Sequence, residues 1–313
     1  MSAIITGGSG FIGRALAADL RRQSRDVLAL SSADVDLVDR AATFAWFERQ
    51  TRDRTWDEIY HLAAVYKAGG WPEHHPATQF HLNMAININV LEAWRRFAPT
   101  ARLTSALSYC VYPEGEQAHA EEEIDTGTPE PYLFAYAMTK KALLIGQRAY
   151  VQEHGLSGAS AVLPTVYGPG DSFAENSHVM GALIGKAARA ARDGASEFEV
   201  WGDGTQRREY LYIDDAVSGL QAVAAGARDL DVVNLASGEA PALRDVVDTI
   251  VAEAKFRGAV RYNTSRFVGT ATRQLSDVRA RTRLAWRPAY PWKDGVASTV
   301  NHYRRALETG RES

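Results

Sequence analysis

Three short segments carry side chains that can move protons. Ser108 and Cys110, the latter the only cysteine among 313 residues, share one segment; Tyr136 and Lys140 follow four residues apart, and His178 lies beyond them. A phenol can pass a proton to or from a sugar oxygen while hydride moves at the adjacent carbon. Cysteine and histidine, with reference pKa values of about 8.5 and 6.5, change protonation state near neutrality. If these groups converge on one cleft, the chain can move both hydrides and carbon-bound protons.

Residues four apart on a helix lie about 5–6 Å apart at Cβ, so Tyr136 and Lys140 share one face of a predicted helix over residues 136–154. We expect the ammonium to lower the pKa of the tyrosine from its usual value of about 10. Simpler interpretations compete for the other two residues. A lone cysteine is commonly a buried packing thiol, and His178 follows Asn176 and Ser177, which are good helix caps.

A glycine-rich segment opens the chain. Glycines at 7, 10 and 13 follow an apolar strand predicted over 3–6 and begin a helix predicted over 11–22. Such glycines permit a tight turn, close approach of a pyrophosphate to backbone N–H groups, and close packing of helix on strand. The positive end of the helix then faces the phosphates. The position of the motif favours a dinucleotide site over a turn without a ligand.

The sequence leaves the choice between NAD and NADP open, with NAD slightly favoured. After a second strand over 27–30 the chain continues with Ser31, so the strand end has neither an acidic residue for a ribose 2′-hydroxyl nor an arginine for a 2′-phosphate. Asp34 or Asp36 can reach back to this point, and Arg14 can turn forward to it.

Apolar segments alternate with helical segments over the first 110 residues or so, which indicates a parallel sheet covered on both faces. We expect an α/β fold, a Rossmann-like doubly wound parallel sheet, with a dinucleotide-binding domain over residues 1–165 and a smaller lobe over 166–313. Residues from about 210 to 240 are apolar enough to return to the first domain. Further strands are predicted over 58–64 and 102–108, and further helices over 40–50, 83–97 and 177–192.

The composition excludes several classes of protein. A formal charge of −3 with mixed signs gives no basic field for nucleic acid. The apolar runs are shorter than the roughly 20 residues of a membrane span, and the first residues leave no room for a signal peptide, so we expect a cytoplasmic protein. One cysteine allows neither an internal disulfide nor a thiolate metal cage, and no metal site is predicted.

Over essentially its full length the chain resembles the extended short-chain dehydrogenase/reductase family. The matching motifs are TGGSGFIG at the start, HLAA at 61–64, YAMTK at 136–140 and PTVYGPG at 164–170. The stretches SYCVYP at 108–113 and WGDGTQRREYLYIDD at 201–215 resemble most closely the members that epimerise and reduce a GDP-linked 4-keto-6-deoxymannose.

The resemblance implies an enzyme that inverts C3, C5 or both of a nucleotide sugar, here a GDP-sugar, with a nicotinamide cofactor acting at C4. It gives Ser108, Tyr136 and Lys140 the hydride site, and makes Cys110 and His178 the base and acid that invert carbons beside a ketone. The cofactor residues that it implies are Gly7, Gly10, Phe11, Ile12, Gly13, Ser31, Leu62, Ala63, Tyr136, Lys140 and Pro164. The substrate residues that it implies are Asn176, Lys186, Trp201, Arg208 and Arg273, the last with Asp277 nearby.

Alternatives remain at this point. Arginines that grip an NADP 2′-phosphate in such epimerase–reductases are replaced here by Ser9 and by Ser31 and Ser32, which favours a redox-neutral epimerase of an intact GDP-hexose that keeps one NAD. A 4,6-dehydratase would need acids near residues 108–112, which the chain lacks. A non-catalytic dinucleotide-sensing protein is an alternative of another class. Members of the family commonly dimerise through two helices, and segments 85–94 and 142–150 offer apolar faces for a homodimer.

Overall fold

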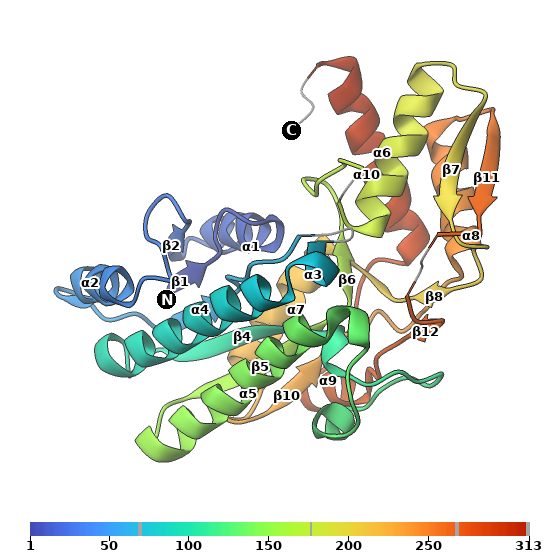
Figure 1. Cartoon of the computed structure of the whole chain (residues 1–313). Helices are drawn as coiled ribbons and strands as arrows, with labels where there is room; N and C mark the ends of the chain where they lie inside the picture. Colours follow the sequence, from blue (N-terminus) through green and yellow to red (C-terminus); the bar gives the residue numbers. More distant parts are fainter. Residues whose placement is uncertain (68–70, 176, 267–268, 311–313) are drawn as a thin grey trace.

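The computed structural model describes residues 1–67, 71–175, 177–266 and 269–310. Its centre is a six-stranded sheet in the order β10-β5-β4-β3-β1-β2, in which all neighbouring strands are parallel (Figure 1). The strands are β1 (Ser2–Thr6), β2 (Asp26–Leu30), β3 (Glu58–His61), β4 (Arg102–Ser108), β5 (Gly158–Leu163) and β10 (Val232–Asn234). The strand order reverses between β1 and β3, and the crevice beyond such a switch point is where ligands bind in doubly wound sheets.

Helices cover both faces of this sheet, and successive side chains along each strand point to opposite faces. On β1, Ile4 joins one buried cluster, whereas Ala3 and Ile5 join the other. One face is covered by α1 (Phe11–Arg22) and α7 (Ile213–Gly226), and the other by α2 (Arg40–Thr51), α4 (Pro76–Phe97) and α5 (Phe134–His154). None of the helices in the described ranges combines the length and the apolar character of a membrane span.

The remaining elements gather mainly beside the sheet, at the upper right of Figure 1. Two short parallel pairs connect this region with the sheet domain, β6 (Thr165–Tyr167) with β9 (Tyr210–Tyr212), and β8 (Arg207–Arg208) with β12 (Thr272–Arg273). A third parallel pair joins β7 (Glu197–Trp201) to β11 (Ala259–Asn263). The helices of this part are α6 (Val179–Arg192), α8 (Leu243–Ala254) and α10 (Trp292–Glu308), while α9 (Val278–Leu284) packs against α7 and β10.

The predicted α/β class is confirmed, with three differences in detail. The helix expected from residue 83 begins seven residues earlier, at Pro76, because proline fits the first helical turn, where its missing N–H is not needed. A short helix, α3 (Trp71–His74), precedes it. Of the segments expected to return to the main sheet, β10 does so, but β9 pairs with β6 instead.

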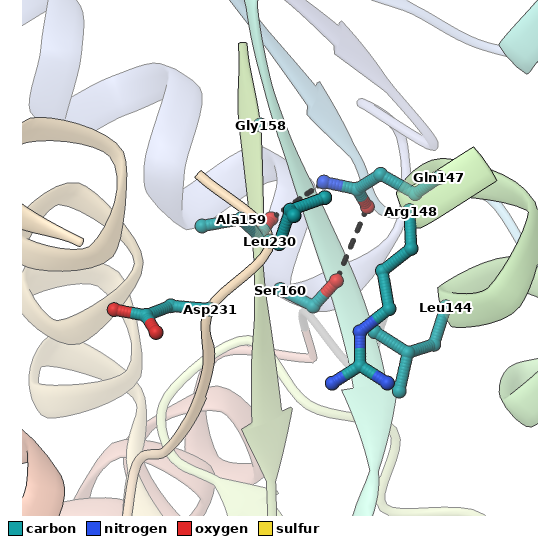
Figure 2. Close-up of a pocket in the computed structure, with 8 residues that line it drawn as sticks. All are labelled: Leu144, Gln147, Arg148, Gly158, Ala159, Ser160, Leu230 and Asp231. Carbon is teal, nitrogen blue, oxygen red and sulfur yellow. Dashed lines mark hydrogen bonds between the residues drawn. The ribbon is translucent and has the colours of Figure 1, made fainter. Parts of the chain in front are cut away.

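Buried polar contacts fix α5 on the sheet. Gln147 donates to the carbonyl oxygens of Leu103 on β4 (3.2 Å) and Ala159 on β5 (3.0 Å), and its own oxygen accepts from the Ser160 hydroxyl at 3.1 Å. Figure 2 shows Gln147, Ala159 and Ser160 around a small hollow near the amino end of β5, the end opposite Pro164. Because a buried amide must be satisfied, these bonds allow only one height and rotation of the helix over the strands. The amino end of α5, with Tyr136 and Lys140, is thereby placed at the carboxyl ends of β4 and β5.

Candidate active site

The junction between β1 and α1 accepts only glycine at three positions, one of which is Gly8, where a Cβ would lie 2.8 Å from the Cα of Ala29. Gly7 has φ of +71°, and a Cβ added there would lie 2.9 Å from the nitrogen of Ala63. A Cβ on Gly13 would lie 2.2 Å from the carbonyl oxygen of Gly7. By contrast, a Cβ on Gly10 would meet a single atom of the described residues within 4 Å, that same oxygen at 3.2 Å. The backbone is therefore tightly packed on its inner side and open beside Gly10.

Helix α1 begins at this open point without a side-chain cap. Gly10 is the N-cap, no side-chain cap bond is formed, and the first turn, which starts with Phe11 and Ile12, contains no acidic residue. The first N–H groups of a helix have no partner within the helix, and they attract anions. The five residues predicted here, Gly7, Gly10, Phe11, Ile12 and Gly13, thus form a cradle that fits a pyrophosphate.

The carboxyl end of β2 carries an acid after all. The Asp34 carboxylate folds back and accepts hydrogen bonds from the backbone N–H (2.7 Å) and the hydroxyl (2.8 Å) of Ser31, and these bonds lower the pKa of Asp34. Asp36 instead accepts from the nitrogen of Val38. Arg14 donates to the carbonyl oxygens of Ser9 and Gly170, so its guanidinium is engaged away from Ser31. Of the three residues considered from the sequence, Asp34 is the one that reaches the strand end.

A directed chain of hydrogen bonds starts at the end of β1 and runs through β3 to α5. The backbone nitrogen of Ala63 donates to the Thr6 hydroxyl at 3.2 Å, and this hydroxyl lies 2.7 Å from Nδ1 of His61. On the other side of the ring, Nε2 of His61 lies 3.2 Å from Oδ1 of Asn87 on α4. Asn87 in turn donates to the carbonyl oxygen of Thr139, so its Oδ1 accepts, and the His61 proton lies on Nε2. Burial, with the charge of Lys140, lowers the pKa of His61 to about 3, and the ring is neutral. The predicted residues Leu62 and Ala63 directly follow this anchored histidine.

Tyr136 and Lys140 lie together near the start of α5, but not in the electrostatic state expected from their spacing. The Lys140 ammonium donates to the carbonyl oxygen of Ala106 on β4 at 2.9 Å, and lies 5.8 Å from the centre of the Tyr136 ring. Burial lowers the pKa of Lys140 to about 8. Burial, with Cys110 and Tyr66 nearby, raises the pKa of Tyr136. The predicted lowering of the tyrosine pKa is therefore wrong for this structure, because desolvation of the phenol outweighs the ammonium.

Cys110 is buried just past the carboxyl end of β4. It lies in a short 3-10 helix, η1 (Tyr109–Val111), whose first turn is capped by Ser108: the Ser108 hydroxyl accepts from the nitrogen of Cys110 at 3.4 Å. Burial raises the pKa of the thiol, while Ser108, Arg273 and Lys140 act in the opposite direction. Cys110 belongs to a small cluster with the ring of Tyr136, separate from the two large cores. The thiol is thus packed, in the same cluster as the ring of Tyr136.

An aromatic stack links His178 to the same cluster. His178 is the N-cap of α6, and its imidazole stacks on Tyr66 with ring centres 5.4 Å apart and planes 8° apart. The ring of Tyr66 lies 5.0 Å from that of Tyr136 and belongs to the cluster that contains Cys110. The structure therefore brings Ser108, Cys110, Tyr136, Lys140 and His178 to one place, the carboxyl end of the sheet. Pro164, between β5 and β6, lies at the same end of the sheet.

The residues predicted to contact the substrate fall into two groups. Trp201, at the end of β7, is 46% exposed, and two cations lie over its ring, Lys186 at 5.7 Å and Arg266 at 5.3 Å. Arg208 and Arg273 lie directly opposite each other in the pairing of β8 with β12. Asn176 lies outside the described residues.

Arg273 has a different partner from the one expected. Its guanidinium forms an ion pair with the buried carboxylate of Glu130, and lies 5.2 Å over the ring of Tyr109. Asp277 instead pairs with Arg281, four residues later in the chain, and a carboxylate oxygen of Asp277 lies 3.6 Å from a guanidinium nitrogen of Arg281. The sequence favoured Asp277 because it is close in the chain, whereas the fold brings the loop that precedes α5 onto β12.

Sequence reasoning missed two residues beside His178. Tyr66 follows the HLAA motif, and nothing distinguishes it in the sequence from the other tyrosines. Asp171 follows the PTVYGPG motif; it is 7% exposed, and one of its carboxylate oxygens accepts from the nitrogen of Ser172. The other oxygen has no hydrogen-bond partner among the described residues. Burial raises the pKa of this carboxyl, while Ser172, His178 and Arg14 act in the opposite direction.

Comparisons with known proteins agree with this geometry. A sequence model described as the NAD dependent epimerase/dehydratase family matches residues 3–236. The chain is 30% identical to the GDP-L-fucose synthase of Escherichia coli, in an alignment that covers 96% of this chain and 95% of the relative. It is 29% identical to GDP-L-fucose synthase 1 of Arabidopsis thaliana, over 96% of this chain and 92% of the relative. The solved structure of a GDP-L-fucose synthetase from Naegleria fowleri bound to NADP superimposes with a TM-score of 0.87, at 25% identity, over 99% of this chain and 96% of that one.

The unpartnered oxygen of Asp171 leads to a prediction about stability. Burial raises the pKa of this carboxyl above its usual value, so the folded state holds the proton more tightly than the unfolded state does. The free energy of unfolding therefore falls as pH rises from about 4 through the raised pKa of Asp171. Above this raised pKa, the buried carboxylate is ionised and the loss of stability is complete. Asp171→Asn keeps the acceptor for Ser172 and removes the charge. We expect its melting temperature to exceed that of the unchanged protein at pH 7, by about 2–4 °C for each kcal/mol, and to match it near pH 4. A variant that melts lower at pH 7 would show that the carboxylate is stabilising instead.

Proposed function

Because the chain belongs to the NAD dependent epimerase/dehydratase family, we propose that it is an enzyme that epimerises a GDP-sugar at C3, C5 or both, with a nicotinamide cofactor acting at C4. One observation carries this proposal: Cys110, Tyr136 and His178 meet through a single aromatic cluster at the carboxyl end of the sheet. The named relatives, GDP-L-fucose synthases, match the chain over nearly its full length, which supports a GDP-linked substrate.

The site contains the groups that such a reaction needs. A C–H bond beside a ketone is acidic because its anion is an enolate, and inversion requires a proton acceptor on one face and a donor on the other. Cys110 and His178 are the pair for this step. Tyr136 exchanges a proton with the oxygen at C4, and Lys140 fixes the end of α5. The cofactor, when bound, accepts or supplies the hydride at C4.

The later part of the chain, residues 166–313, holds the nucleotide in this proposal. The exposed ring of Trp201, with Lys186 and Arg266 over it, offers an aromatic and cationic surface. Arg208, opposite Arg273 on the paired strand, supplies the guanidinium fork that suits diphosphate oxygens, while Arg273 is engaged by Glu130. Asn176 stays a prediction, as does the cytoplasmic location.

A second candidate differs only in its redox balance. The enzyme then oxidises C4 of an intact hexose such as that of GDP-mannose, inverts a neighbouring carbon and returns the hydride, keeping one NAD. The Asp34 carboxylate at Ser31 favours this version, because it places a negative charge at the strand end that faces the ribose 2′ position in such folds. A dinucleotide sensor without activity is not supported, since Ser108, Tyr136 and Lys140 are all in place and the named relatives are enzymes.

The substrate assay is made in D2O. GDP-4-keto-6-deoxymannose with NADPH tests the version that ends in reduction, and GDP-mannose without added reductant tests the redox-neutral one. Deuterium at C3 or C5 of the sugar, located by NMR, supports the epimerase. The absence of both product and deuterium uptake with GDP-mannose rejects the redox-neutral version, and the same result with both sugars rejects the proposed function.

Cys110→Ser separates proton transfer from cofactor binding. We expect the variant to keep the dinucleotide affinity of the unchanged protein, because the cradle at Gly10 is untouched, and to lose solvent exchange at a sugar carbon by about 100-fold or more, the usual scale of general acid–base catalysis. Fluorescence titration of the cofactor and NMR of the sugar measure the two effects. Unchanged deuterium exchange in this variant would mean that the cysteine only packs against Tyr136.

Asp34 leads to a prediction about the cofactor. A 2′-phosphate near this carboxylate meets a charge of like sign, so we expect NADH to bind about tenfold more tightly than NADPH in fluorescence titrations at low salt. Asp34→Ala should narrow the gap, whereas Asp36→Ala, which removes a carboxylate bonded to Val38, should leave it unchanged. The Naegleria fowleri structure contains NADP, so the two proteins are expected to differ at this position. Tighter binding of NADPH by the unchanged protein would contradict the proposed role of Asp34.

We also propose a homodimer formed through α4 and α5. These helices pack side by side, and each exposes an isoleucine, Ile88 at 53% and Ile145 at 62%. Replacing both isoleucines with glutamate should change the mass in light scattering from twice the chain mass of 34.3 kDa to that mass itself. Val278→Glu, at a residue 51% exposed on α9, is the matched control and should remain a dimer. A monomeric unchanged protein would contradict the proposal.

A further inference from the structure

Tyr66 is held firmly although it lies in a loop. The segment that contains it follows β3, and the preceding residue, Val65, is fixed on both sides by Asn83 of α4. The nitrogen of Val65 donates to Oδ1 of Asn83 at 2.8 Å, and Nδ2 of Asn83 donates to the carbonyl oxygen of Val65 at 2.9 Å. Asn83 is itself 2% exposed. A two-sided amide clamp of this kind leaves the backbone at Tyr66 little freedom.

The ring of Tyr66 occupies the space between the hydride-site tyrosine and His178. Its centre lies 5.0 Å from that of Tyr136, at an angle of 53°, and 5.4 Å from that of His178, nearly parallel. Tyr132, in η3 (Pro131–Leu133), the turn that precedes α5, packs against the same small cluster as Tyr66. The phenol is therefore held by the clamp on its backbone and by the rings that surround it.

Apart from Asp171, which acts on it by charge and without a hydrogen bond, His178 has little else among the described residues to orient its ring. It is exposed and forms the N-cap of α6 without a side-chain capping bond, and its backbone carbonyl accepts from the nitrogen of Ala182. Among the described residues, the stack on Tyr66 is the only ring contact of the imidazole, and no hydrogen bond to the ring is present. A proton donor or acceptor must be held close to its target carbon, and a misplacement of about 1 Å can cost about 100-fold in rate. An exposed histidine at a helix start does not meet that requirement without support.

We propose that Tyr66 is the positioning residue for His178: its clamped ring holds the imidazole over the sugar carbons beside C4. The inference rests on the proposed function, since it assigns a partner to the acid–base histidine of that reaction. Tyr66 transfers no proton in this account, because burial raises the pKa of its phenol. What it supplies is a flat, fixed surface against which the imidazole takes one orientation.

Three variants test this role. Tyr66→Leu removes the stack, Tyr66→Phe keeps the stack and removes only the hydroxyl, and His178→Ala removes the group that is positioned. We expect Tyr66→Leu to slow deuterium exchange at the sugar carbon that His178 serves by about 100-fold, while the affinity for the dinucleotide changes less than about threefold. Tyr66→Phe should retain exchange within about fivefold of the unchanged enzyme. In the His178→Ala background, Tyr66→Leu should cause no further loss, because a residue that acts through His178 has nothing left to position.

A second measurement needs no activity. The chain has 8 histidines, and comparison with His178→Ala assigns the ring signals of His178 in an NMR spectrum of the histidine-labelled protein. A stacked phenol displaces these signals upfield by its ring current. We expect Tyr66→Phe to retain the displacement and Tyr66→Leu to lose it. If the His178 signals have the same positions in the unchanged protein, in Tyr66→Phe and in Tyr66→Leu, the proposal is overturned, whatever the assay shows.

The outcomes also separate this inference from the proposed function. If the unchanged enzyme exchanges deuterium and the losses from Tyr66→Leu and His178→Ala multiply in the double variant, Tyr66 is structural and the inference fails while the function stands. If the unchanged enzyme exchanges no deuterium with either sugar, the proposed function fails, and the positioning of the ring is decided by the NMR spectra alone.

Discussion

The docking of α5 on the parallel sheet determines where the reactive groups lie. Lys140 buries its ammonium to donate to Ala106 on β4, and Gln147, two turns further along, donates to both β4 and β5. Burying a charged group is costly, and this appears in the lowered pKa of Lys140. Because Lys140 and Gln147 make these contacts, the amino end of α5 is fixed, and Tyr136 is placed against Cys110 at the end of β4.

The same burial sets the resting state of the proton-transfer groups. Desolvation raises the pKa of both Cys110 and Tyr136, so each is neutral in this structure. Arg273 and Lys140 act in the opposite direction on the thiol, and Arg273 is itself held by the buried Glu130. Neutral acids beside fixed cations can stabilise negative charge that develops on an oxygen of the proposed substrate. His178 differs from these groups because it is exposed and depends on an aromatic neighbour for its orientation.

The sequence predicted the fold well because its signals are local. Strands and helices follow from apolar periodicity, and the turn at Gly7 follows from close backbone packing that only glycine permits. That five distant residues share one site was implied by the family resemblance, because no local pattern brings His178 to the end of β4. The sequence offered both Asp34 and Asp36 as acids for the end of β2 but could not choose between them. It could not predict contacts that depend on loops, such as the pairing of Arg273 with Glu130 or the stack of Tyr66 on His178. The pKa of Tyr136 was predicted in the wrong direction because helical spacing gives distance to a charge but not burial.

The central claim is that one sugar ring meets the hydride site and the proton-transfer pair at the same time. A crystal structure with the dinucleotide and a GDP-sugar bound tests it most directly. The account predicts that the nicotinamide and Tyr136 lie at C4, and that Cys110 and the His178 ring, still stacked on Tyr66, approach opposite faces of a neighbouring carbon at about 3–3.5 Å. A bound sugar whose carbons beside C4 lie out of reach of both Cys110 and His178 would contradict it.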